Sequence, residues 1–202
     1  MPAAPHTIVN VGYRSTNFWV LSAGRSRLLV DLGWPGRFAA LRANLAQKGI
    51  PIEEIRYGLA THYHIDHAGC AQELKNQGMR LIVTPEQLAA IPLMKRWTKP
   101  ADRYLDIATD DNTVVAIAES RAFLAALGFA GEFVHTPGHS DDSVSLVLDD
   151  ASAFTGDLTP EGMIGAEDAD VVVQSWRKLR DLGARTVYAG HGPVRALEPA
   201  AR

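Results

Sequence analysis

The stretch LATHYHIDHAGC, residues 59–70, holds three of the chain's seven histidines and one aspartate, in the spacing His62-x-His64-x-Asp66-His67. Alternate residues leaving a strand point the same way, so His62 and His64 can face one point. Asp66 and His67 come a step later, where the chain is expected to turn into a helix, and can face a second point beside the first. Imidazole nitrogens and carboxylate oxygens are good ligands for divalent first-row metals. The stretch therefore predicts half of two adjoining metal sites.

Three more candidate ligands directly follow predicted strands elsewhere in the chain. They are His139 in HTPGHS, Asp157 in FTGD and His191 in YAGHG. Each is bordered by glycine or proline, which lets the backbone turn sharply and present a side chain. Together with the first stretch they make a candidate set of five histidines and two aspartates. Their positions at strand ends favour convergence on metals over packing in a core.

The elements that must position these residues can be located from apolar periodicity and turn residues. Strands are expected at TIVNVGY, at NFWVLSAGRSRLLVDLG (two strands about the turn AGRS), and at IRYGLAT, MRLIVT, TVVAIA, GEFVHT, SVSLVLD, SAFTGD and TVYAGHG. Helices are expected at RFAALRANLAQKG, over about residues 68–77, at PEQLAAIPLMKRW from Pro85, at SRAFLAALG, and over residues 167–183. Residues 98–113 are expected to be irregular. Strands that alternate with helices predict a layered α/β core.

The composition limits the class of protein. A chain of 202 residues with 47 % hydrophobic and 21 % charged residues suits one soluble globular domain. A net charge of −3 gives no indication of a nucleic-acid partner, because nucleic-acid-binding surfaces are usually basic. Neither a secretory signal nor an apolar run of the ~20 residues that span a bilayer is visible. With a single cysteine, Cys70, the chain is expected to be cytoplasmic, without a membrane partner. The sequence assigns no oligomeric state.

The motifs resemble those of the metallo-β-lactamase-fold hydrolase superfamily. LLVDLG, THYHIDHAG, HTPGHS, FTGD and AGHG occur in that family's order, from about Val30 to Gly192. The resemblance implies an α/β fold, an αββα sandwich of two packed mixed β-sheets with outer helices. It also implies a single domain over residues 1–202, with a helical insertion at about 85–128. The metals would lie at one edge of the sandwich.

The resemblance implies a role for each matching residue. The implied ligands of a first divalent metal are His62, His64 and His139. Those of a second are Asp66, His67 and His191. Asp157 would bridge the two metals, and Asp31 at its strand end would support the metal loop from behind without being a ligand. Zinc is the default metal, and iron and manganese also suit a set of nitrogen and oxygen ligands.

The implied function is a dinuclear metal-dependent hydrolase acting on a small-molecule substrate. A metal-bridging hydroxide would cleave a small carbonyl ester, thioester or lactone, and Asp66 would hold it and pass its proton to the leaving group. Asp157 is similar to the bridging residue of glyoxalase II-type thioesterases, lactonases and persulfide dioxygenases, whereas the commonest zinc β-lactamases have a cysteine there. The alternatives are a mononuclear iron, persulfide-dioxygenase-like oxidoreductase, a ligand-binding module that retained the metals, and a β-lactamase-like amide hydrolase.

Some residues have two interpretations. Met94, Trp97 and Tyr104 in the helical middle could line an apolar substrate pocket under a lid, or simply pack that segment onto the sandwich. His135 could hydrogen-bond a ligand or face away from the site. Asp141 and Asp142 could orient a histidine or be a solvated turn pair. Cys70 is expected to be a small buried residue.

Overall fold

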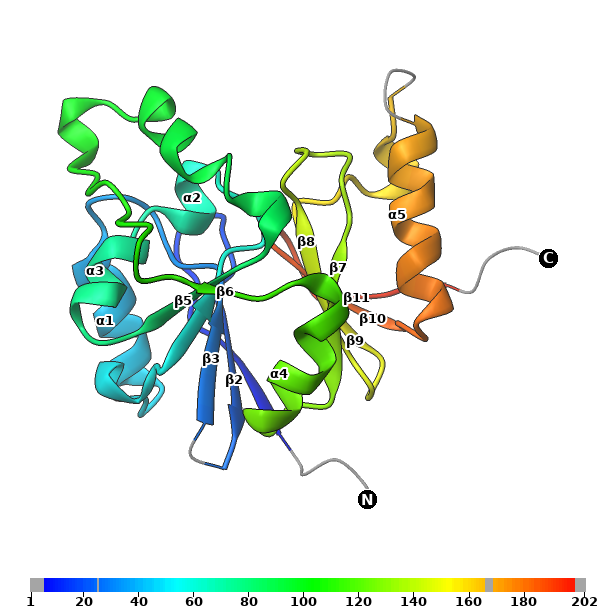
Figure 1. Ribbon diagram of the computed structural model, residues 1–202, viewed down its shortest axis with the longest axis horizontal. Coiled ribbons are helices and arrows are strands. Elements are labelled where there is room, and N and C mark those ends of the chain that lie inside the picture. The colour runs from blue at the N-terminus through cyan, green and yellow to red at the C-terminus, as the bar shows by residue number, and fades with distance from the viewer. Residues whose placement is uncertain (1–5, 25, 166–168, 199–202) are drawn as a thin grey trace.

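Two β-sheets with helices on their outer faces form the protein (Figure 1). The computed structural model describes residues 6–24, 26–165 and 169–198. The first sheet has the order β1-β2-β3-β4-β5-β6 and the second β11-β10-β9-β8-β7. The strands of the first sheet are β1 (Thr7–Asn10), β2 (Trp19–Ala23), β3 (Ser26–Val30), β4 (Tyr57–Leu59), β5 (Arg80–Val83) and β6 (Thr113–Val114). Those of the second are β7 (Gly131–His135), β8 (Val144–Leu148), β9 (Ser152–Gly156), β10 (Thr186–Ala189) and β11 (Arg195–Ala196).

The helices cover the outer faces and make the crossovers. They are α1 (Phe38–Gln47), α2 (Ile65–Ala68), α3 (Ala71–Asn76), α4 (Ser120–Ala126) and α5 (Ala169–Asp181). Strands β1, β2 and β3 pair antiparallel, whereas β3, β4, β5 and β6 run parallel. In the second sheet β9 and β10 are parallel, with α5 between them in sequence. Among the described residues no helix is long and apolar enough to cross a bilayer.

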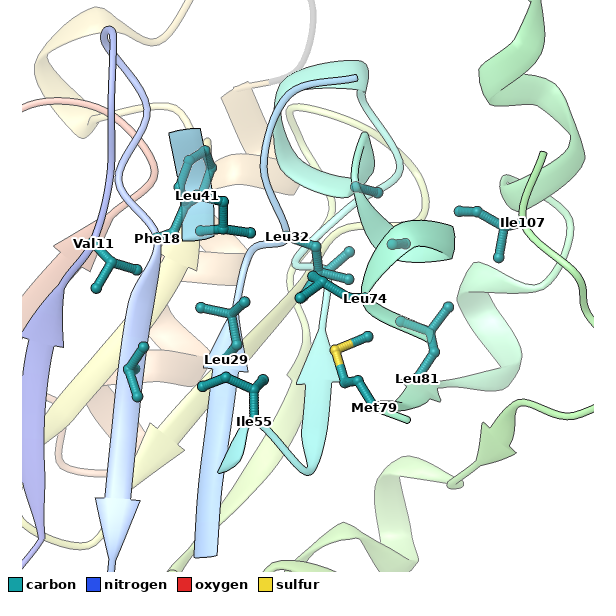
Figure 2. Close-up of a cluster of buried hydrophobic side chains, with 14 of the residues drawn as sticks. Val11, Phe18, Leu29, Leu32, Leu41, Ile55, Leu74, Met79, Leu81 and Ile107 are labelled. Carbon is teal, nitrogen blue, oxygen red and sulfur yellow. The ribbon is translucent and has the colours of Figure 1, made fainter. Parts of the chain in front are cut away.

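Alternation along β3 shows how the sandwich buries two faces of each sheet. Leu28 and Val30 point between the sheets, where they join Phe133 and Phe154 of the second sheet in one buried cluster. Leu29 points the other way, into the cluster under α1 and α3 that Figure 2 shows. On the far side, Trp176 and Leu179 of α5 pack on the outer face of the second sheet. The layers are therefore helix, sheet, sheet and helix.

Two predicted helices differ from the observed elements. The helix predicted at residues 68–77 begins at Ala71, as α3, and the shorter α2 precedes it. Between the two, the loop after β3 takes up backbone groups: Leu32 N–H donates to His67 O, and Gly69 N–H donates to Gly33 O. The single helix predicted from Pro85 is broken into two 3₁₀ helices, Pro85–Gln87 and Ile91–Trp97, and a third, Pro100–Asp102, follows it. Pro92 has no N–H and disfavours α geometry in the residue before it.

The remaining boundaries agree with the sequence in outline. Within the expected insertion at 85–128, β6 extends the first sheet and α4 contributes Leu124 to the cluster between the sheets. The stretch before β6, residues 85–112 and called the arm from here on, lies above α2 in Figure 1 and packs Met94 into the cluster under α1 and α3. The predicted start of the last helix at residues 167 and 168 lies outside the described residues. Strand β11 was not predicted.

Candidate metal centre

The structure brings the seven predicted residues together at one edge of the sandwich. His62 and His64 lie in the loop between β4 and α2, and Asp66 and His67 lie on α2. The other three come from the second sheet, where they follow β7, β9 and β10: His139, Asp157 and His191. Both sheets therefore supply residues to one site.

The seven side chains form two adjoining groups. In the first, which holds His62, His64 and His139, the candidate ligand atoms lie within 4.8 Å of one another. Nε2 of His139 is 3.0 Å from Nδ1 of His64. The second group is equally close and consists of Asp66, His67, Asp157 and His191. Within this grouping, His62 and His64 lie in one group and Asp66 and His67 in the other, as the spacing of the LATHYHIDHAGC stretch predicted.

The carboxylate of Asp157 lies between the two groups. Its Oδ2 is 3.6 Å from Nε2 of His139 and 3.3 Å from Nε2 of His191. The same atom is 4.0 Å from Nε2 of His62. Its Oδ1 is 3.3 Å from Nε2 of His67. One carboxylate thus reaches nitrogen atoms of both groups.

Buried polar atoms without partners show that this chemistry fits a divalent cation. Nε2 of His62, Nε2 of His67 and Oδ1 of Asp157 are all buried and form no hydrogen bond. Such atoms are rare in folded proteins, and each calls for an explanation. Buried nitrogen and oxygen atoms that converge on one place without hydrogen bonds between them are the arrangement that a divalent first-row metal requires.

Asp31 fixes the orientation of His67. It follows β3, is 1 % exposed, and its Oδ2 lies 2.9 Å from Nδ1 of His67. Its Oδ1 accepts hydrogen bonds from both N–H and Oγ1–H of Thr61, each at 2.8 Å. The ring of His67 therefore donates from Nδ1 and turns Nε2 toward the cluster, which is the supporting position that the resemblance implied. Asp31 has a left-handed backbone (φ 62°), which aspartate adopts more readily than most residues.

The loop between β1 and β2 supplies contacts that the sequence did not indicate. Nδ1 of His191 donates to the carbonyl oxygen of Ser15 at 2.6 Å. Oγ1 of Thr16 donates to Oδ2 of Asp66 at 3.2 Å and accepts from Nε1 of Trp34 at 3.0 Å. No motif marks these residues. Thr61 was also overlooked, although its place directly before His62 in the motif could have drawn attention to it.

The local electrostatics separate the two buried histidines. Burial lowers the pKa of His62 well below its ordinary value, and the neighbouring histidines add to this, so the ring is neutral. Burial also opposes the charged form of His67, but the carboxylates of Asp31, Asp157 and Asp66 outweigh it and hold its pKa well above the ordinary value. For Asp66, burial raises the pKa, and the hydrogen bond and charge of His67 overcome it, leaving the pKa at about 2.

The residues with two interpretations have defined places. Nε2 of His135 donates to the carbonyl oxygen of Asp141 at 2.7 Å, away from the seven side chains. Oδ2 of Asp142 accepts from the N–H of Tyr63 at 2.7 Å and so holds the backbone between His62 and His64. Cys70 is buried, as expected, and donates to the carbonyl oxygen of Trp34 at 2.8 Å.

The three residues predicted for a substrate pocket lie on the arm. Met94 is fully buried in the cluster under α1 and α3, and Tyr104 packs against that cluster. Trp97 is 69 % exposed. A cavity of about 450 Å³ borders the site, but its walls come from the segments after β7, β9 and β10. The pocket role of the three residues stays a prediction.

Comparison with known proteins agrees with this geometry. The family described as the metallo-beta-lactamase superfamily matches residues 11–191. An atrochrysone carboxyl ACP thioesterase of Aspergillus fumigatus is 33 % identical over 185 residues, which span 90 % of this chain and 52 % of that protein. A beta-lactamase-like protein 2 homolog of Caenorhabditis elegans is 30 % identical over 186 residues, spanning 90 % and 57 %. The chain thus spans about half the length of the curated relatives it matches.

A solved structure confirms the predicted fold. A metallo-beta-lactamase family protein of Thermus thermophilus superposes with a TM-score of 0.70 at 21 % identity, covering 97 % of this chain and 75 % of that one. At this identity the likeness supports the αββα sandwich alone. The family match extends over nearly the whole chain and includes all seven residues of the site but none of the β1 strand. The chain belongs to the metallo-beta-lactamase superfamily.

Proposed function

We propose that the chain is a dinuclear metal-dependent hydrolase that cleaves a small carbonyl ester, thioester or lactone, and that residues 1–202 act as a single domain. The observation that carries the proposal is the pair of adjoining nitrogen and oxygen groups that share Asp157. Two groups with a carboxylate between them fit two cations better than one. A thioester is favoured among the substrates because the relative from A. fumigatus is named a thioesterase.

The proposed ligands divide as the two groups do. One cation would be held by His62, His64 and His139. The other would be held by Asp66, His67 and His191. Asp157 would contact both, and zinc is the proposed metal, with iron or manganese as the other candidates. When bound, such cations polarise a carbonyl oxygen and lower the pKa of water toward neutrality.

The chain's own side chains prepare the site for this reaction. Asp31 and the carbonyl oxygen of Ser15 hold the protons of His67 and His191 on Nδ1, so that both Nε2 atoms are free to bind. Asp66, with a pKa of about 2, is ionised at neutral pH, and Thr16 fixes its Oδ2. We propose that the carboxylate of Asp66 accepts the proton of the attacking water and delivers it to the leaving group.

The cavity beside the site offers space for the substrate's acyl group. Its walls include His139, Asp157 and His191 on the metal side. Leu158, Pro160 and Met163 supply apolar side chains. A volume of about 450 Å³ falls in the range of small-molecule sites. An acyl chain placed in this cavity, called the acyl cavity from here on, would have its carbonyl carbon next to the cluster.

The test combines metal analysis with a hydrolysis panel. Purified protein is analysed for zinc, iron and manganese and is then assayed on thioesters, lactones, aryl esters, phosphodiesters and a chromogenic β-lactam. Close to two metal ions per chain with thioester, ester or lactone hydrolysis supports the proposal. His64→Ala, which removes one proposed ligand, should abolish both the full metal content and the activity. One iron per chain with oxygen uptake on a persulfide would instead support the oxidoreductase and overturn the proposal.

A further inference from the structure

A second cavity, of about 340 Å³, shares no lining residue with the acyl cavity and is lined in part by Ile65 at the start of α2. Its lining comes from four segments of the chain and includes Arg14, Trp34, Arg37, Ile65, Asp102 and Arg103. Ile65 stands between the proposed ligands His64 and Asp66 in sequence. Trp34 reaches Asp66 through the hydroxyl group of Thr16. The cavity, here called the arginine cavity, is therefore a direct neighbour of the candidate metal centre.

The three arginines of the cavity have unbalanced charge. Among the described residues, none of their guanidinium groups takes part in an ion pair or a side-chain hydrogen bond, whereas Arg27, Arg121 and Arg180 elsewhere are paired with carboxylates. The one acid in the lining, Asp102, already accepts the N–H of Lys99 at 2.6 Å. The lining thus carries three positive side chains and one negative side chain, and that carboxylate already accepts a hydrogen bond. This excess of positive charge attracts anions to the cavity.

The guanidinium group of Arg14 has a fixed support. It lies over the ring of Trp34, 5.0 Å from the ring centroid. Stacking of this kind orients the planar group and leaves its N–H edge free to donate. The indole N–H of the same tryptophan donates to Thr16, so Arg14 is linked to the carboxylate of Asp66 through two intervening residues, Trp34 and Thr16.

Two of the three arginines occupy backbone geometry that few residues other than glycine adopt. Arg14 has φ 58° and Arg103 has φ 53°. Such conformations cost free energy and persist where surrounding contacts impose them, often at binding sites. Next to Arg103, the backbone of the arm packs closely against the loop before α1: a Cβ added at Gly36 (φ +66°) would lie 2.4 Å from the carbonyl oxygen of Asp102. This close packing brings Arg37 and Arg103 to the same cavity.

We propose that the arginine cavity binds an oxyanion group, a carboxylate or a phosphate, carried by the substrate whose carbonyl carbon is attacked at the metal centre. Guanidinium groups bind both kinds of oxyanion through paired N–H donors. The substrate would extend from the arginine cavity past Ile65 to the cluster, with its acyl group in the acyl cavity. The inference rests on the proposed hydrolase function and adds to it that the substrate is anionic on its leaving-group side.

The test uses three thioesters of one acyl group whose thiols differ only in carrying no charge, a carboxylate or a phosphate. The double variant Arg37→Gln/Arg103→Gln removes two of the three charges, and Arg177→Gln, an exposed arginine on α5, is the matched control. In the wild type, KM should be lowest for one of the anionic thioesters. The double variant should raise that KM about tenfold, the loss expected for a charge-assisted hydrogen bond, and leave kcat and the uncharged thioester unchanged. The control should behave as the wild type.

Each outcome decides between the two proposals. Equal KM values for charged and uncharged thioesters in the wild type would refute anion binding in the arginine cavity, and so would an unchanged preference in the double variant. Either result would leave the proposed hydrolase function standing. The better of the carboxylate and phosphate thioesters identifies the oxyanion. If no thioester is cleaved, calorimetry with inorganic phosphate still tests the cavity: weaker binding in the double variant than in Arg177→Gln supports it, and equal binding refutes it. Arg14→Gln, measured in the same way, guards against a folding defect in the double variant.

Discussion

Asp31→Asn should change which nitrogen of His67 carries the proton while keeping the shape of the residue beside it. Asparagine has the same size and also tolerates the left-handed backbone at this position (φ 62°), so the substitution adds little strain. The amide oxygen can keep both hydrogen bonds from Thr61, which places the amide NH₂ group against Nδ1 of His67. Nδ1 must then accept, and the ring proton moves to Nε2, the atom that faces the cluster. His67 would no longer offer a lone pair there.

The magnitude follows from the one contact that changes. Loss of the ligand's carboxylate partner typically weakens metal affinity ~10–100-fold, equal to ~1.4–2.7 kcal/mol. The metal-free chain should lose about 1–1.5 kcal/mol of unfolding free energy, the difference between a buried charge-assisted hydrogen bond and the neutral one that replaces it. Zinc affinity is measured by competition with a chromophoric chelator, and stability by urea unfolding of the metal-free protein.

The matched control is Asp142→Asn. Asp142 is also largely buried and also accepts a backbone N–H of the motif, from Tyr63, but it forms no hydrogen bond or ion pair with the seven side chains of the site. An asparagine there keeps its acceptor, so zinc affinity should stay close to the wild-type value. Folded Asp31→Asn protein that binds zinc as tightly as the wild type would refute the view that Asp31 sets the tautomer of His67.

Three further predictions concern the site and the core. Gly190→Ala should reduce bound zinc, because its Cβ would lie 2.5 Å from Oδ1 of Asp157 and 2.6 Å from Cε1 of His67; Gly162→Ala, with open space around it, should not. Zinc affinity should fall as the pH is lowered from about 8 to about 6. The carboxylates outweigh burial and hold the pKa of His67 well above its ordinary value, so a proton must leave this ring before a cation binds. A zinc affinity independent of pH would contradict this. Leu124→Ala, at a fully buried position between the sheets, should cost about 2–5 kcal/mol in urea unfolding, and a smaller loss would mean that α4 contributes little to the core.

The sequence predicted the convergence of the seven side chains from two signals: the spacing within residues 62–67, and the glycine beside each of the three later residues at a strand end. That local signal was enough for His139, Asp157 and His191, although they are far from His62 in the chain. The succession of strands and helices along the chain was predicted from apolar periodicity and turn residues, and the αββα sandwich from the resemblance to the family's motif order. Residues at strand ends are thus the ones whose positions in this fold are best predicted from the neighbouring sequence.

The contacts of the β1–β2 loop could not be predicted, because they depend on a pairing distant in sequence. Asn17 holds this loop against the segment after β10 through its N–H, which donates to Gly190 O, and its side chain, which donates to Ala189 O. Thr16 reaches Asp66 only as a result of that pairing. The helix from Pro85 is not continuous for a local reason: the apolar spacing is helical, but Pro92 disfavours α geometry and the segment forms short 3₁₀ helices.

The origin of the proposed ligands in two different sheets has a thermodynamic consequence. Cations held by both sheets would act as a cross-link, and neither sheet could unfold without releasing them. The free energy of unfolding would then rise with the free metal concentration, by ~2.7 kcal/mol when that concentration is a hundred times the dissociation constant. The melting temperature of this chain would become a measure of its metal supply, and scarcity of metal would shorten the lifetime of the fold as well as stop the reaction.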